Sequence, residues 1–233
     1  MAAAGARWGR RAGYRRRRPL PALAVLVALV VLSGLVWTNV FDSIPSLEAA
    51  TTCNKPGRAT QPPEASGMPP QVPLGEMKNR DALNSVTPIP PEDVHVRVLN
   101  GNGESRQATL VSDELESLGF TPIGADDDAV YVNYDLKCHG QIRYGGAGVS
   151  AARTLSLIAP CAQLVRDERA DAGVDLALGS EFDDIKTTQS AKQVLQQLES
   201  WVPQREAQDD GRGEVSPPKI DKKLLQDARD VHC

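Results

Sequence analysis

The stretch VHVRVLNGNG, from Val94 to Gly103, decides how the fold begins. Valine occupies every second position from Val94 to Val98, and a period of two is typical of a β-strand. The asparagines and glycines that follow favour a tight turn. Apolar residues then recur at helical spacing from Ala108 to Leu118, and Gly119 stands where a helix C-cap belongs. With Phe120–Ile123 as the next strand, the stretch predicts a strand, glycine loop, helix and strand in succession.

The same theme repeats further along the chain. The segment QIRYGGAG (Gln141–Gly148) predicts a strand and a second glycine loop, and a helical pattern then runs from Val149 to Ala159 until Pro160 stops it. Strands are expected at Cys161–Val165 and Val174–Leu178, with a short extra strand at Ala129–Tyr134. Residues 93–182 are therefore predicted to form a small α/β domain on a mainly parallel or mixed sheet.

Two amphipathic patterns follow this domain and form a C-terminal extension, residues 183–233. The first runs from Ile185 to Val202 and the second from Ile220 to Val231, with a polar loop from Pro203 to Pro218 between them. Helices with one apolar stripe usually bury it against their own domain, which is the interpretation we favour over a partner-binding helix.

The N-terminus predicts a membrane anchor. Residues 1–18 hold seven arginines and no acid, and residues 19–41 are uncharged. Leu20–Trp37 alone would span about 27 Å as a helix, close to the thickness of a bilayer core. Positive charge on one side only places residues 1–18 in the cytoplasm and the rest of the chain outside. A cleaved signal peptide and a lipoprotein signal at Cys53 are the alternatives.

The charge of the exported part argues against nucleic acid as a partner. The chain has 26 basic and 30 acidic residues, and without the seven N-terminal arginines the balance is 19 to 30. A nucleic-acid-binding surface needs a basic patch to neutralise phosphates. The arginine block suits anionic lipid at the inner leaflet, or it serves only to set the topology.

The segment at residues 42–92 is predicted to be a linker. Ten of the 17 prolines lie between Asp42 and Asp93, and no aromatic residue does. Such a segment buries too little apolar surface to offset its chain entropy. We therefore expect a spacer that holds the domain away from the membrane.

The four cysteines predict two disulfides outside the cytoplasm. Cys138 and Cys161 each precede or open a strand of one parallel pair, so those two are expected to bond to each other. That leaves Cys53 to bond to Cys233. Zinc is the rival ligand, but no pair has metal-ligand spacing such as C-x-x-C, and we predict neither a metal nor a cofactor.

The two glycine loops are the candidate ligand site. If both lie at the carboxyl ends of parallel strands, an anionic glycan or lipid phosphate could bind there beside helix N-termini. The alternatives are plain tight turns, and an Arg143 that pairs with an acid. The candidate residues are Asn100, Gly101, Asn102, Gly103, Arg106, Arg143, Tyr144, Gly145 and Gly146.

No catalytic constellation stands out. The sequence has no G-x-S-x-G, P-loop or H-E-x-x-H motif, and its three histidines, His95, His139 and His232, are scattered. The run Asp126-Asp127-Asp128 lacks the spaced ligands of an EF-hand, so a solvated turn is expected rather than a calcium site. The chain is predicted not to be an enzyme.

In their order, these motifs resemble the LytR C-terminal domain family of bacterial envelope proteins, over about ninety of the 233 residues. The first glycine loop departs from the family pattern at Arg106 and Gln107, where glycine and small residues are usual. The resemblance implies a stand-alone, membrane-anchored type, since residues 42–92 are too few for the catalytic domain of larger members. It implies a non-enzymatic scaffold or regulator of envelope integrity, acting with other envelope proteins. A module that binds cell-wall glycan or lipid-linked glycan is the alternative.

Overall fold

The computed structural model describes residues 25–33, 51–59, 71–208 and 218–233, and the chain divides into two compact units at Pro45 and Ser46. In the first unit, residues 25–33 are helical with exposed side chains. The basic tail 1–18 and most of the predicted span 19–41 lie outside the described residues. Among those that are described, no helix is long and apolar enough to cross a bilayer.

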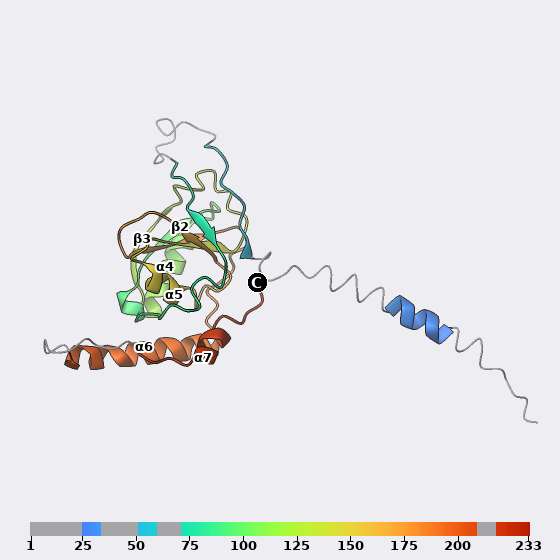
Figure 1. Ribbon diagram of the computed structural model, residues 1–233. Helices are drawn as coiled ribbons and strands as arrows, with labels where there is room; N and C mark the ends of the chain where they lie inside the picture. The colour runs from blue at the N-terminus through green and yellow to red at the C-terminus, as the bar shows by residue number, and fades with distance from the viewer. Residues whose placement is uncertain (1–24, 34–50, 60–70, 209–217) are drawn as a thin grey trace, which may run out of the picture. The chain divides into compact units, whose positions relative to one another are not determined.

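The second unit is an α/β domain with a C-terminal pair of helices (Figure 1). Its elements in chain order are β1 (Glu76–Lys78), η1 (Pro91–Asp93), β2 (His95–Asn100), α4 (Gln107–Ser117), β3 (Thr121–Asp127), β4 (Gly140–Tyr144), α5 (Val149–Leu155), β5 (Gln163–Arg166), β6 (Val174–Leu178), α6 (Gln189–Gln208) and α7 (Lys222–Asp227).

The sheet is mixed, as the sequence predicted. Its six strands have the order β1-β5-β4-β6-β2-β3. Two parallel pairs, β2 with β3 and β4 with β5, are each connected through a helix. Strand β6 joins them, parallel to β2 but antiparallel to β4, and β1 closes the edge antiparallel to β5. The carboxyl ends of β2 and β4 therefore lie at opposite ends of the sheet.

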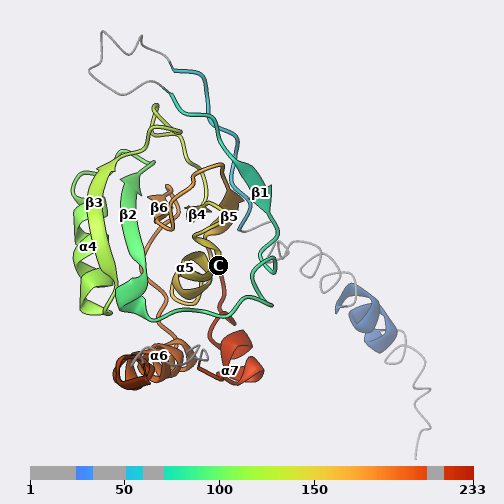
Figure 2. The ribbon, with the colours of Figure 1, turned by 60° about the vertical axis from the view of Figure 1, so that its left-hand side comes forward.

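The main core lies between the sheet and the helices (Figure 2). Alternate residues of β2, Val96 and Val98, face it, and the apolar stripe of α4 supplies Val111 and Leu115. Strands β4 and β6 are buried along their whole length because both of their faces are covered. The tail helices α6 and α7 add Leu198 and Leu225 to the same core, so they pack on their own domain.

The opposite face of the sheet is covered in part by the segment that the sequence predicted to be a linker. Cys53, Leu74, Tyr131 and Leu136 form a second, smaller apolar cluster there. Within the predicted linker 42–92, Cys53 and Leu74 belong to this cover, and residues 76–78 form strand β1. Leu83, from the same segment, is buried in the main core instead. The linker prediction is wrong for these residues. The composition of the segment did not predict this structure. Backbone pairing with β5 and a disulfide stabilise the segment, whereas its own apolar surface is small.

Smaller differences concern the segment between β3 and β4. Strand β3 extends to Asp127, so two of the three aspartates belong to a strand rather than to a solvated turn. The expected strand Ala129–Tyr134 is a turn, closed by the hydrogen bond from the Tyr134 amide to the Tyr131 carbonyl. The turn directs Tyr131 into the second cluster, which a straight strand would not do.

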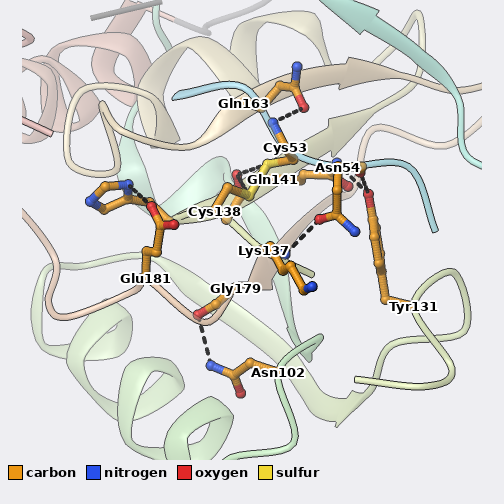
Figure 3. The surroundings of a disulfide bond; sticks show 12 residues. Cys53, Asn54, Asn102, Tyr131, Lys137, Cys138, Gln141, Gln163, Gly179 and Glu181 are labelled. Atoms are coloured by element: carbon orange, nitrogen blue, oxygen red, sulfur yellow. Dashed lines mark hydrogen bonds and ion pairs between the residues drawn. A yellow bond between two sulfur atoms is a disulfide. The ribbon is translucent and has the colours of Figure 1, made fainter. Parts of the chain in front are cut away.

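The predicted disulfide pairing is wrong. Cys53 is bonded to Cys138 and Cys161 to Cys233. The strands after Cys138 and Cys161 are indeed parallel neighbours. However, Cys138 points into the second cluster, where Cys53 also lies. The backbone amide of Cys53 donates a hydrogen bond to the side-chain oxygen of Gln163 in β5, which holds Cys53 beside Cys138 (Figure 3). Cys161 instead meets the chain end that follows α7.

Candidate functional site

A groove of about 1230 Å³ lies on the sheet face that turns away from the helices. Its floor consists of side chains that alternate with the core residues of three strands, namely Arg97, Arg143 and Asp175. Its walls are residues 72–76, 126–130 and 166–171. The alternation of β-strands thus places charged residues in the groove wherever their neighbours fill the main core.

Asp175 lies at the centre of the groove floor. It is the register partner of both Arg97 in β2 and Arg143 in β4. Its carboxylate is 2.5 Å from the Arg169 guanidinium and 4.0 Å from that of Arg97. Three cationic side chains therefore stand around or beside one central acid.

Arg143 does not bind Asp175 but turns to Asp128. The two form a bidentate pair with N···O distances of 2.7 and 2.6 Å, and both side chains are nearly inaccessible to solvent. The guanidinium also donates to Gln141 and lies 5.6 Å from the centre of the Tyr131 ring. This buried pair lines the groove, and Arg143 is a structural residue whose guanidinium is already paired with an acid.

A chain of hydrogen bonds connects this pair to the covering segment. The Gln141 amide donates to the Tyr131 hydroxyl, which donates to the Asn54 carbonyl (Figure 3). Burial raises the pKa of Tyr131 to about 12, and the hydrogen bond from Gln141 only partly opposes this. The tyrosine is therefore a neutral donor at physiological pH.

Arg169 pairs with two acids of the groove. It binds Asp167 at 2.6 Å as well as Asp175. Burial lowers the pKa of Arg169, but the hydrogen bonds to the two carboxylates outweigh it and leave the pKa above its usual value. Burial raises the pKa of Asp167, but its hydrogen bonds with Arg169 leave that pKa below the usual range. Arg169 and Asp167 are therefore both charged at neutral pH.

The groove as a whole is acidic. Its lining contains eight carboxylates against four arginines. Asp126, Asp127, Glu168 and Asp171 are exposed at the rim, whereas two of the arginines are engaged with buried or partly buried acids. A partner with ammonium or guanidinium groups would thus meet a favourable field here.

The comparisons with known proteins identify the family. A family model described as LytR cell envelope-related transcriptional attenuator matches residues 93–182. The cell envelope integrity protein Cei of Mycobacterium tuberculosis is 38% identical over 185 residues, which cover 79% of this chain and 82% of that protein. The chain belongs to the LytR C-terminal domain family.

A crystal structure of a related protein has the same fold. It shows the soluble domain of a conserved hypothetical secreted protein from Mycobacterium marinum, with 37% identity and a TM-score of 0.57. The match covers 69% of this chain and 99% of that domain. Two disulfides and the relation to a secreted protein support an extracytoplasmic location for this member of the LytR C-terminal domain family.

The first glycine loop of this family member is a closed turn. Gly103 has φ 80°, and its amide binds the Asn100 side chain. The Asn102 amide donates to the Gly179 carbonyl at 2.8 Å (Figure 3). Arg106 is the helix N-cap with φ 66°, a conformation in which glycine is favoured, as the family pattern has it. The loop's polar groups are thus largely satisfied within the domain.

The second glycine loop serves close packing. A Cβ on Gly145 would collide with the Arg169 carbonyl, so glycine lets the chain between β5 and β6 approach. Tyr144, just before it, is buried in the main core. Because β4 is antiparallel to β6, this loop lies at the other end of the sheet from the first, and the predicted joint site of both loops is wrong.

The remaining candidates do not form a reactive centre. His139 lies 3.8 Å from Glu181, and among the described residues no group of acids, cysteines and histidines could hold a metal ion. Sequence reasoning missed Arg97, Arg169 and Asp175 as site residues. The sequence did carry a signal for Asp175, which stands between the apolar residues Val174 and Leu176. An acid that is buried in such a strand needs a hydrogen-bonding or charged partner.

Proposed function

We propose that this protein is a non-enzymatic, membrane-anchored scaffold of the cell envelope, which uses the acidic groove to hold a basic segment of another envelope protein. The observation that carries this is the excess of carboxylates in a large open groove. Its volume exceeds the roughly 300–1,000 Å³ of ordinary small-ligand sites. A length of extended chain suits such a space better than a metabolite does.

The composition of the lining supports a binding role rather than catalysis. Among the described residues that line the groove there is no serine, cysteine or histidine to act as a nucleophile or base. The general acid of glycoside hydrolysis needs a carboxyl group with a raised pKa. Asp167 does not suit that role, because burial raises its pKa but the hydrogen bonds with Arg169 leave it below the usual range. The carboxylates therefore serve to attract and orient a partner.

Binding of cell-wall glycan or lipid-linked glycan is the second candidate. The aspartate and arginine side chains of the lining can form hydrogen bonds with sugar hydroxyls, and the groove has room for several sugars. Against it, no aromatic side chain of the described lining offers a stacking surface. The net negative charge further disfavours a phosphorylated glycan.

Complementation of a deletion strain tests the proposal. Deletion should weaken the envelope barrier, and the full chain should restore it. The rim variant Asp126→Asn with Asp127→Asn should fail to restore it although the protein is folded and abundant. The control Asp113→Asn with Glu116→Gln removes two exposed acids from α4, away from the groove, and should restore the barrier fully.

A binding assay separates the two candidates. Immobilised full chain is incubated with membrane proteins or with purified wall, at low and high salt. Salt-sensitive retention of a membrane protein by the wild type but not by the rim variant supports the scaffold. Retention on wall fragments that persists in high salt would replace it with the glycan module.

A further inference from the structure

Three arginine side chains meet in the domain away from the groove, and none forms an ion pair with a carboxylate of the described residues. Arg80 lies in the turn after β1, Arg153 in α5 and Arg229 just after α7. Arg153 and Arg229 both donate to the Asn84 side-chain oxygen, at 3.5 and 2.8 Å. Arg229 also donates to the Arg80 carbonyl at 2.6 Å, and Arg80 donates to the Arg229 carbonyl. We call these residues the arginine cluster.

Two of the three arginines are buried, and none of the three forms an ion pair with a described carboxylate. Arg153 is 1% exposed and Arg229 4% exposed. The Nε atoms of both are buried and have no hydrogen-bond partner among the described residues. Asp81 attracts all three arginines and Asp230 attracts Arg80, but both carboxylates lie outside ion-pairing distance.

Burial lowers the pKa of all three arginines, and for Arg229 the charges of the other two lower it further. As a result, the pKa of Arg229 is about 10. Buried charges are ordinarily paired, because an unpaired one loses its hydration without compensation. A group that supplies negative charge is the element that this cluster lacks.

We infer that the arginine cluster is a binding site for a phosphate group. Guanidinium forks match the geometry of phosphate oxygens, and several oxygens can accept from Arg153 and Arg229 at once. Two or more negative charges would offset three positive ones better than a single carboxylate or chloride does. The acceptors would also satisfy the two buried Nε donors.

Arg80 connects the cluster to a cavity whose lining includes neither Arg153 nor Arg229. Arg80 is half-buried, and the cavity, of about 200 Å³, is also lined by Lys78 and Gln163. A water molecule occupies about 30 Å³ of liquid, so the cavity has room for a group the size of phosphate. Because Arg229 belongs to the C-terminal tail, the bound anion would fasten that tail to α5 and to the turn after β1.

Thermal unfolding of the full chain in a non-ionic detergent tests the site. Inorganic phosphate is compared with chloride at equal ionic strength. Phosphate should raise the Tm of the wild type well beyond the effect of chloride. Arg80→Gln, at the half-exposed position, should weaken the apparent affinity for phosphate by about tenfold, the loss expected for one charge-assisted hydrogen bond. Arg229→Gln should abolish the specific shift.

The matched control is Lys223→Gln, which removes an exposed positive charge from α7 and should keep the wild-type response. Phosphatidic acid in mixed micelles is then added as a competitor. If phosphatidic acid displaces inorganic phosphate, the natural ligand is a lipid headgroup. If it does not, the natural ligand is a free phosphate. Equal effects of phosphate and chloride on the wild type, or an unchanged response of Arg80→Gln, would overturn the site.

Discussion

The face of the sheet on which a charged residue stands determines whether it is buried and which partner it binds. Arg143 sits between apolar core residues in β4, and its alternate position sends it to the groove face. Its partner Asp128 comes from the chain after β3. A buried pair of this kind contributes little net stability when it is intact, but removal of one partner leaves an uncompensated charge.

Substitution of Asp128 by alanine should therefore be severe. We expect the free energy of unfolding to fall by about 3–5 kcal/mol, because Arg143 remains buried without its acid. Denaturant unfolding measures this. Asp227→Ala, which breaks the exposed pair with Lys223, should change the free energy of unfolding far less, because solvent screens this pair. If the two variants lose similar amounts, the Arg143–Asp128 pair does not have the structural role assigned to it.

Tyr131 should make stability fall at alkaline pH. Burial raises its pKa from 10.0 to about 12 in the folded protein. Between these values the unfolded chain releases the proton and the folded chain keeps it, so stability is lost as pH rises through this window, by at most about 2–3 kcal/mol. Unfolding free energies on both sides of the window measure the slope. Tyr131→Phe should flatten it, whereas Tyr134→Phe, at a partly exposed position, should leave most of it.

At the scale of elements, the cover of the groove face depends on covalent and edge contacts. Residues 51–59 carry few apolar side chains, yet Cys53 is 5% exposed because its disulfide and the Gln163 side chain hold it against β4 and β5. Strand β1 is three residues long and pairs only with the edge strand β5. Such elements have little stability apart from the domain.

Loss of the Cys53–Cys138 bond should release this cover. The bond closes a separation of 85 residues, for which the chain-entropy model gives about 4–5 kcal/mol. Cys53→Ser with Cys138→Ser should lower the Tm and make the segment sensitive to proteases. Peptide mapping without reduction should recover Cys53 with Cys138 and Cys161 with Cys233. Peptides that join Cys138 to Cys161 would contradict the structure.

At the scale of the whole molecule, one strand separates the two halves of the fold. Because β6 is parallel to β2 and antiparallel to β4, the two similar halves point in opposite directions. Their glycine loops cannot form one site, and the large groove lies instead across the sheet face. The orientation of the whole chain relative to the membrane remains a prediction from the seven N-terminal arginines.

A reporter fused after Cys233 tests that orientation. A form that works only outside the cytoplasm should be active, because the positive charges hold residues 1–18 on the inner side. Replacement of the seven arginines by glutamine should reduce the exported fraction. Activity of a cytoplasmic reporter at the same position would contradict both the export and the proposed anchor.

The sequence by itself determined the elements that depend on local patterns. The alternating valines of Val94–Val98 and the helical spacing up to Leu118 are properties of neighbouring residues, and they predicted β2, α4 and the parallel pairing with β3. The amphipathic stripes likewise predicted α6 and α7. The order of the motifs was sufficient for the family.

The tertiary structure alone decided the strand order, the disulfide pairing and the groove. Each depends on contacts between residues far apart in the chain, such as Cys53 with Cys138 or Asp128 with Arg143. Local pattern gives the face on which a side chain stands, but not which distant segment covers that face. The antiparallel placement of β6 against β4 follows from how both halves bury one shared core, a free energy that no single segment encodes.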